Sequence, residues 1–210
     1  MTRPAHFKFT AGQFARIGLK VGDDLVVRAY SVVSSPFDET LEFFSIVVPD
    51  GAFTSNLQHL KVGDELYLEK IPYGFLTLAR YQLPLPQDLW LLATGTGLAP
   101  LIWIVRTASE LAYVDRIQEI AEQFGEGHTG FKFIPIITRD PHAALHDRLP
   151  ILIENGELEK AADLHFNVET THVMLCGNPQ MVDDTKAALK ARGLTMNRRG
   201  EGNIAVENYW

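Results

Sequence analysis

The chain of 210 residues has few cysteines and no long apolar stretch. Its single cysteine, Cys176, excludes an internal disulfide and a multi-cysteine zinc or iron–sulfur site. No stretch approaches the roughly 20 apolar residues that a membrane-spanning helix needs, and the start from Met1 to His6 lacks an apolar signal core. We therefore expect a cytoplasmic protein without a membrane segment. Any redox chemistry must come from an organic cofactor.

Basic residues are fewer than acidic ones, which gives the chain a net charge of −7. This argues against a broad nucleic-acid surface, so we expect no nucleic-acid partner. The content of 46% apolar and 21% charged residues is typical of a soluble globular protein. A chain of this length can bury two modest cores. We predict two domains, residues 1–85 and residues 86–210.

The first 80 residues have the composition of short strands separated by Gly, Asp and Pro. We predict five strands: 14–19, 25–33, 41–48, 65–71 and 75–78. This pattern predicts a small antiparallel Greek-key barrel. Residues 54–60 are predicted to form a short helix with Thr54 or Ser55 as its N-cap, and free amides at a helix start can bind an anion.

The second half has an alternating α/β pattern. The apolar run 89–93 is predicted to be a buried strand, and Gly95-Thr96-Gly97 follows it directly, as in the first turn of a Rossmann-like unit. Further strands are predicted at 131–137 and 172–176, and an amphipathic helix at 180–192 that ends at Gly193. Pro84 and Pro86 mark an extended connector before this half.

The run Arg28-Ala29-Tyr30-Ser31 lies near the end of a predicted strand. A guanidinium can clamp a pyrophosphate, a tyrosine ring can stack on an isoalloxazine, and a small hydroxyl can hydrogen-bond at the ring edge. The run therefore indicates a bound flavin. A surface Arg beside a packed Tyr on an ordinary strand is the competing interpretation of these four residues.

Five motifs in order give the chain a specific resemblance over almost its whole length. They are Arg28 to Ser31, Pro49-Asp50-Gly51 followed by Thr54, Gly95-Thr96-Gly97, Cys176-Gly177-Asn178-Pro179, and the terminal Tyr209-Trp210. Together they resemble the ferredoxin–NADP reductases of the bacterial type. Those enzymes pair an FAD-binding barrel with an NADP-binding Rossmann-like domain, so the resemblance implies this β plus α/β fold.

The resemblance also implies which residues bind FAD. Arg28 and Thr54 would hold the pyrophosphate, Tyr30 would stack on the isoalloxazine, and Ser31 would lie near flavin N5. Thr96 would lie where flavin and nicotinamide meet, and Trp210 would cover the flavin. The other positions of the matching segments are Ala29, Phe44, Ser45, Ile46, Val47, Ala52, Phe53 and Tyr209.

For NADP(H), the resemblance implies a second set of residues. Arg106, Arg139 and Arg148 match positions that grip the adenosine phosphates, and arginine forks suit a 2′-phosphate. Cys176 would lie beside the nicotinamide, followed by Gly177 and Asn178 in the binding turn. A small buried core residue is the plainer interpretation of Cys176. Glu207 matches a carboxylate near the active site of plant relatives, or it is a solvated tail residue.

The implied activity is reversible hydride transfer from NADPH to FAD, followed by single-electron transfer to ferredoxin or flavodoxin. Ser31, Cys176 and Tyr30 are the expected catalytic residues, and we expect a monomer. Both carriers are commonly acidic, so docking needs a local basic face, for which Lys70, Arg80, Arg198 and Arg199 are candidates. The alternatives are a free flavin reductase, a reductase component of an oxygenase, and a non-catalytic nucleotide-binding protein.

The chain departs from this family pattern at two places. Only eight residues precede Phe9, where a first strand or hairpin is normal, so we expect one open barrel edge. Residues 101–105 join directly to Arg106, which leaves no room for the dozen or more residues of a parallel crossover. An omitted segment predicts a break in the backbone between about Leu101 and Thr107, and a real deletion predicts a domain without a central strand.

Overall fold

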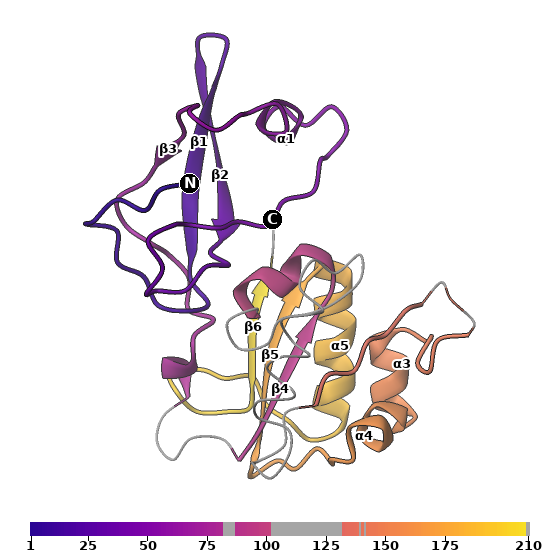
Figure 1. The fold of residues 1–210 in the computed structure, drawn as a ribbon. Helices are drawn as coiled ribbons and strands as arrows, with labels where there is room; N and C mark the ends of the chain where they lie inside the picture. The colour runs from indigo at the N-terminus through magenta and orange to yellow at the C-terminus, as the bar shows by residue number, and fades with distance from the viewer. Residues whose placement is uncertain (82–86, 102–131, 139, 141, 209–210) are drawn as a thin grey trace.

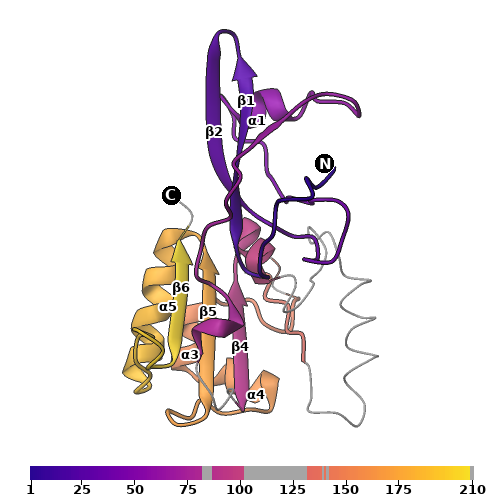
Figure 2. The same cartoon turned by 90° about the vertical axis from the view of Figure 1, so that its left-hand side faces the viewer.

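The fold is that of a computed structural model, which describes residues 1–81, 87–101, 132–138, 140 and 142–208. Two three-stranded sheets form the two halves of the molecule, one antiparallel and one parallel (Figure 1). Figure 2 shows the halves stacked end to end, with the β1–β2 hairpin pointing away from the second half. None of the described helices is long and apolar enough to cross a membrane.

The first sheet has the strand order β2-β1-β3. Its strands are β1 (Phe14–Val21), β2 (Asp24–Ser31) and β3 (Tyr67–Leu68), all paired antiparallel. Gly22, with φ 62°, allows a two-residue turn between Val21 and Asp24. Alternate residues of β1 turn inward, so that Ile17 and Leu19 pack with Phe53. The predicted strands at 14–19 and 25–33 are confirmed.

The rest of the predicted barrel is less regular than expected. Residues 41–48 and 75–78 form no regular strand, and the strand predicted at 65–71 contains only the two residues of β3. Isolated bridges, Val32 with Phe43 and Phe14 with Tyr73, replace longer ladders. Ile46, Val47 and Val48 have exposed side chains, so residues 46–48 have no apolar face buried against a neighbour. The barrel is therefore not closed within the described residues, as the expected open edge predicts.

The second sheet has the order β4-β5-β6 and is parallel. Its strands are β4 (Asp88–Ala93), β5 (Thr171–Gly177) and β6 (Ile204–Asn208), and the first two confirm predicted strands. Helices α3 (Leu149–Glu154), α4 (Glu157–Ala162) and α5 (Pro179–Ala191) accompany it. Leu92, Val173 and Leu175 share one core with Leu152 and Leu189 from α3 and α5.

The opposite face of this sheet is covered by residues of the first half and by the turn after β4. Met174, Cys176 and Ala205 form a second core with Leu76 and Tyr81. This two-sided burial explains the continuous apolar sequence of β4 and β5. Such a core ties the two halves of the molecule together.

Helix α5 begins and ends as its sequence predicts. The side chain of Asn178 accepts hydrogen bonds from the backbone N–H groups of Gln180 and Met181, at 2.9 and 3.3 Å. After the helix, Gly193 has φ 91°, which suits a residue just past a helix end.

Three features of the second half differ from the predictions. The strand expected at 131–137 is absent from its described residues, 132–137. Helices α3 and α4 and strand β6 were not predicted, since short apolar runs do not distinguish strands from helices. The predicted break between Leu101 and Thr107 lies outside the described residues, as do most residues of the predicted connector.

Candidate active site

The run Arg28 to Ser31 ends strand β2, with Arg28 and Tyr30 on one face of the sheet. Arg28 is exposed, and its Nη1 donates a hydrogen bond to the carbonyl of Val27 at 2.7 Å. A guanidinium in this position is open to an anion from solvent. Ser31 is buried and lies opposite Phe14 of β1.

The ring of Tyr30 is held by two other aromatic rings. Its centroid lies 5.7 Å from that of Phe53 and 6.5 Å from that of Phe43, the latter in an edge-on arrangement. Ser45 Oγ donates a hydrogen bond to Tyr30 Oη at 3.3 Å. Tyr30 is partly exposed, so the ring is fixed in orientation and still accessible for stacking.

The turn before helix α1 (Thr54–Leu57) differs from its prediction. Neither Thr54 nor Ser55 is the N-cap, which is Phe53 without a side-chain hydrogen bond. Thr54 Oγ1 accepts from the backbone N–H of Val48 at 2.9 Å, and Ser55 Oγ donates to the carbonyl of Gly51 at 2.6 Å. These hydroxyls therefore fix the loop 48–54, and a phosphate bound here would depend on backbone amides. Ala52 in this turn is exposed.

Two glycine turns meet at the carboxyl ends of β4 and β5. A Cβ on Gly97 would lie 2.3 Å from the Cα of Gly177, and one on Gly177 would lie 2.4 Å from Thr94 Oγ1. The same Oγ1 accepts a hydrogen bond from the backbone N–H of Asn178 at 3.3 Å. Both positions therefore require glycine, and the edge is shaped for close approach of a ligand to backbone. The segment Gly95–Leu101 forms a 3₁₀ helix directly after β4.

Cys176 is fully buried near the carboxyl end of β5. It lies beside Ala93 of β4 and Glu207 of β6 in the strand register. The plain interpretation as a core residue therefore holds for its packing. Its position also lies next to the two glycine turns.

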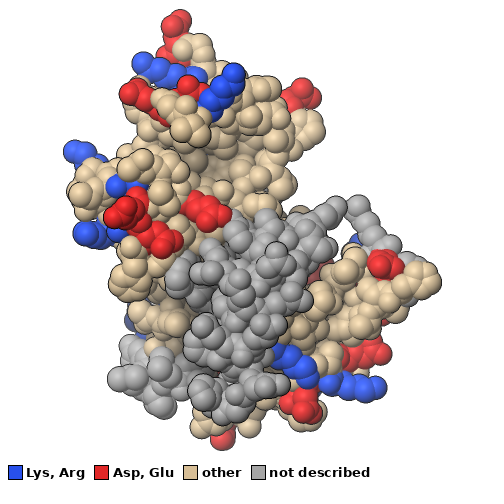
Figure 3. Space-filling model, viewed as in Figure 1, with Lys and Arg blue, Asp and Glu red and all other residues tan. Residues whose placement is uncertain are grey.

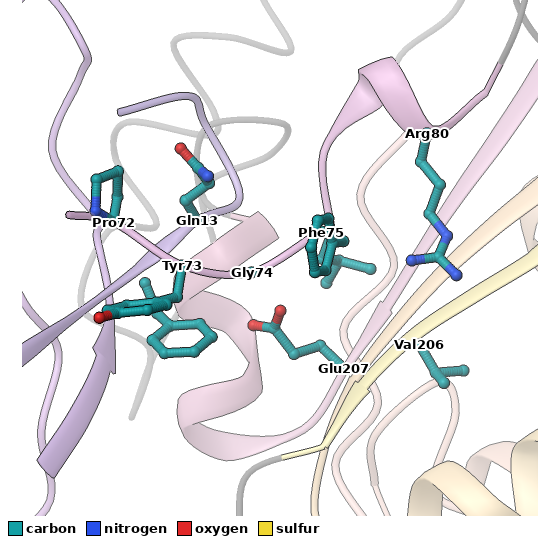
Figure 4. Close-up of a pocket in the computed structure, with 10 residues that line it drawn as sticks. Gln13, Pro72, Tyr73, Gly74, Phe75, Arg80, Val206 and Glu207 are labelled. Carbon is teal, nitrogen blue, oxygen red and sulfur yellow. The ribbon is translucent and has the colours of Figure 1, made fainter. Parts of the chain in front are cut away.

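Glu207 is a site residue that the sequence left ambiguous. It lies on β6, and its side chain reaches across to the first half of the molecule, where it approaches Gly74 and Tyr73 (Figure 4). Its Oε1 is buried and has no hydrogen-bond partner among the described residues. Burial raises the pKa of Glu207 to about 7, against the opposing effects of the Phe75 amide and the Arg80 charge. The interpretation as a solvated tail residue is wrong.

Glu207 lines a cavity of about 440 Å³ between the two halves, together with Phe14, Tyr73, Gly74 and Phe75. A chain of contacting residues along this cavity connects the predicted flavin position to the predicted nicotinamide position. Phe14 pairs with Ser31 and stacks on Tyr73, with ring centroids 5.7 Å apart. Gly74 then meets Glu207, which is paired with Cys176. The predicted catalytic residues Ser31 and Cys176 are thus connected through four intervening residues.

The remaining predicted site residues fall into two groups. Phe44 packs with Val33, Leu98 and Ala99, which joins the predicted flavin segment to the turn that carries Thr96. Arg148 is exposed and directly precedes α3. Four predicted residues lie outside the described part of the chain: Arg106, Arg139, Tyr209 and Trp210.

Comparison with known proteins defines the class first. Residues 1–77 match the family of oxidoreductase FAD-binding domains. The structure of a ferredoxin NADP+ reductase from Neisseria gonorrhoeae, solved with bound FAD and NADP, superimposes with a TM-score of 0.88 at 35% sequence identity. The superposition includes 99% of this chain and 89% of the Neisseria chain. The two halves are therefore an antiparallel FAD-binding half and a Rossmann-like NADP-binding half.

Curated relatives then define the family. The flavodoxin/ferredoxin–NADP reductase of Escherichia coli is 40% identical over 223 positions, with 96% of this chain and 88% of the relative covered. The ferredoxin–NADP reductase of Pseudomonas aeruginosa is 38% identical, with 98% and 88% covered. The chain belongs to the flavodoxin/ferredoxin–NADP reductase family. The first alignment is longer than the 210 residues of this chain, so that relative has positions without a counterpart here.

Proposed function

We propose that this protein transfers hydride from NADPH to bound FAD and then passes single electrons to ferredoxin or flavodoxin, in a reversible reaction. The contact path from Ser31 through Phe14, Gly74 and Glu207 to Cys176 carries this proposal. It connects the ends of β2 and β5 through Phe14, Gly74 and Glu207, which all line one cavity, and a reaction between two bound cofactors requires such proximity.

The described residues fit an FAD group in the first half, which we assign to residues 1–85. Tyr30 offers a partly exposed ring whose tilt is fixed by Phe43 and Phe53. Arg28 offers an exposed guanidinium on the same face of β2, two residues away. The flanking predicted segments are 44–47 and 52–54. When bound, FAD supplies the capacity to accept two electrons together and release them singly.

The second half, assigned to residues 86–210, fits a dinucleotide at the edge where β4 and β5 end. Gly97 and Gly177 leave the backbone accessible there, and parallel α/β sheets bind ligands at this edge. Thr96 lies in the turn after β4 and Cys176 near the carboxyl end of β5, at the edge that would face the nicotinamide. Arg148 would hold the adenosine phosphates, together with Arg106 and Arg139.

The chain's own contribution is to position the cofactors and to hold a proton. Glu207 has a pKa of about 7 because of its burial, so it exchanges a proton near neutral pH. Glu207 lines the cavity together with Phe14 and Gly74 of the contact path. We infer that it retains a proton close to the reacting atoms while Phe14 and Tyr73 limit access of water.

We further propose a monomeric, cytoplasmic enzyme whose partners are a carrier protein and NADP(H). The Escherichia coli relative is named for flavodoxin and ferredoxin, and the Pseudomonas aeruginosa relative is named for ferredoxin. A free flavin reductase of the same fold would reduce its acceptor without a carrier protein. A non-catalytic nucleotide-binding protein would bind NADPH and leave the flavin oxidised.

An anaerobic visible spectrum of the purified protein tests these alternatives. We expect a flavin spectrum that NADPH bleaches at least about ten-fold faster than NADH, and whose colour returns when oxidised ferredoxin is added. A bound flavin that neither nucleotide reduces would contradict the proposal.

The flavin site has a matched pair of variants. Tyr30→Ser removes the proposed stacking ring and should lower the bound FAD content. Tyr67→Ser removes an exposed tyrosine from β3 in the same sheet and should leave the FAD content unchanged. Equal FAD content in both variants would show that Tyr30 does not contact the flavin.

A further inference from the structure

Thr94 is the first residue after β4, and it begins the turn of residues 94–97, which we call the β4 turn. Residues 177 and 178, at the end of β5, are called the β5 turn. Figure 1 shows β4 and β5 side by side and directed toward the first half of the molecule. Both turns therefore lie at the edge that would face the nicotinamide.

All three polar groups of Thr94 form hydrogen bonds within or between these turns. Its backbone N–H donates to the carbonyl of Cys176 at 3.3 Å, and its carbonyl accepts from the N–H of Gly97 at 3.0 Å. Its Oγ1 accepts from the backbone N–H of Asn178 at 3.3 Å. Thr94 is thus bonded to its own turn through its backbone and to the β5 turn through its side chain.

The bond from Asn178 to the Thr94 hydroxyl also involves the start of helix α5. The side chain of Asn178 accepts hydrogen bonds from the N–H groups of Gln180 and Met181, in the first turn of the helix. Asn178 therefore binds Thr94 with its backbone and the helix with its side chain. Thr94 Oγ1 fixes the position of this helix start relative to β4.

The junction leaves room for a hydroxyl group and little more. A Cβ on Gly177 would lie 2.4 Å from Thr94 Oγ1 and 2.9 Å from the Thr94 carbonyl oxygen. A Cβ on Gly97 would lie 2.4 Å from the Cys176 carbonyl oxygen. The backbones of the two turns therefore approach closely around the Thr94 side chain, and a change in that side chain would displace them.

Charged side chains do not align the two turns. Residues 93–101 and 176–180 include no Lys, Arg, Asp or Glu. On the face shown in Figure 3, acidic and basic side chains are interspersed over both halves, and neither sign of charge is gathered on one half. The alignment of the turns therefore depends on the hydrogen bonds and close contacts around Thr94.

We propose that Thr94 is a positioning residue for hydride transfer, whose hydroxyl aligns the β5 turn with the β4 turn and so fixes where the nicotinamide lies. This inference rests on the proposed function. The bond from Asn178 to Thr94 is exposed to water, so by itself it adds little to the stability of the fold. A dinucleotide bound at this edge would exclude water from the bond and strengthen it. Thr94 should therefore affect the rate of hydride transfer, which a displacement of about 1 Å can lower about a hundred-fold.

Three variants of the FAD-loaded protein test the hydroxyl in anaerobic stopped-flow mixing with NADPH. Thr94→Val removes the acceptor and should lower the limiting rate of flavin reduction about ten-fold or more. The Kd for NADP+ should stay within about three-fold, because the proposed arginine contacts to the adenosine phosphates supply most of the affinity. Thr94→Ala removes the acceptor without placing a methyl group against Gly177 and should show the same loss. Thr94→Ser keeps the hydroxyl and should reduce the flavin within about two-fold of the wild-type rate.

The matched control is Thr170→Val. Thr170 Oγ1 donates to Asp88 Oδ2 at 3.1 Å, so it joins the same two strands at their opposite end. Its loss removes one hydroxyl hydrogen bond from the same sheet and leaves the two turns intact. The limiting rate of flavin reduction in this variant should stay within about two-fold of the wild-type rate.

Amide hydrogen exchange gives a measurement that does not depend on turnover. With NADP+ bound, the Asn178 amide should exchange at least about ten-fold faster in Thr94→Val and Thr94→Ala than in the wild type. Thr94→Ser and Thr170→Val should leave this amide protected. An Asn178 amide that is equally protected in all four variants would show that the hydroxyl does not hold the β5 turn.

The rates provide three further outcomes. The inference is overturned if Thr94→Val and Thr170→Val reduce the flavin at the same limiting rate, or if Thr94→Ser is as slow as Thr94→Val. It is also overturned if the Thr94 variants change only the Kd for NADP+, since the hydroxyl would then bind the ligand without aligning the turns. A wild-type flavin that NADPH does not reduce at all would instead refute the proposed function.

Discussion

The partly buried Glu207 makes stability depend on pH in a direction opposite to that of an ordinary glutamate. Below pH 4.5, the carboxyl group is protonated in both the folded and the unfolded chain. Between pH 4.5 and about 7, the unfolded chain releases the proton first, so the free energy of unfolding falls as the pH rises. Above about pH 7 the carboxyl ionises in both states, and the fall levels off.

The magnitude follows from the two pKa values. A change from 4.5 to about 7 corresponds to about 3 kcal/mol over the full pH range. Between pH 5 and pH 8 the expected loss from this group is about 2.5 kcal/mol. Glu207→Gln keeps the shape of the side chain and removes the ionisation. The variant should therefore gain about 2.5 kcal/mol relative to the wild type when the pH is raised from 5 to 8.

Urea unfolding of the FAD-loaded proteins at a fixed FAD concentration measures this difference, with flavin release and circular dichroism as signals. Other titrating groups cancel because only the difference between variant and wild type is used. Glu201→Gln, in the turn before β6, is the matched control because Glu201 is exposed. If Glu207→Gln and wild type lose stability in parallel from pH 5 to pH 8, the carboxyl does not carry the raised pKa.

Two further substitutions test the packing that positions the site. Gly97→Ala places a Cβ 2.3 Å from the Cα of Gly177. The variant should therefore slow flavin reduction by NADPH at least about ten-fold in anaerobic mixing, with the FAD content unchanged. A normal rate would show that the two turns can separate freely. Arg192→Ala removes one partner of the buried Glu159 carboxylate, which keeps the Phe166 amide, and should lower the free energy of unfolding by about 2 kcal/mol near pH 7 in urea titrations. Lys190→Ala, an exposed change two residues earlier on α5, should cost about 0.5 kcal/mol or less, and an equal loss in both variants would contradict the role of the ion pair.

Local signals in the sequence predicted some regular elements of both halves, although not α3, α4 or β6. The apolar run at 89–93 and the alternation in 14–19 identify β4 and β1, because a buried strand and a half-buried strand differ in their apolar period. Helix α5 was predicted at 180–192 with its end at Gly193, a signal that depends on near neighbours in the chain. Residues 41–48 have a strand-like composition and still form no strand, since a ladder needs a partner segment at the correct distance.

The candidate site shows the same division between local and long-range information. The motifs around Tyr30, Gly97 and Cys176 are each contiguous in sequence, so the sequence alone could mark them as candidate site residues. The environment of Glu207 could not, because its carboxylate is enclosed by Gly74 and Phe75, more than 130 residues earlier in the chain. A glutamate three residues from the end of a chain gives no local signal of burial. Only the pairing of β6 with β5 carries it into the cavity, where the sheet of one half meets the loop of the other. The pKa of Glu207, and any proton it holds during the reaction, is therefore a property of how the two halves fit together.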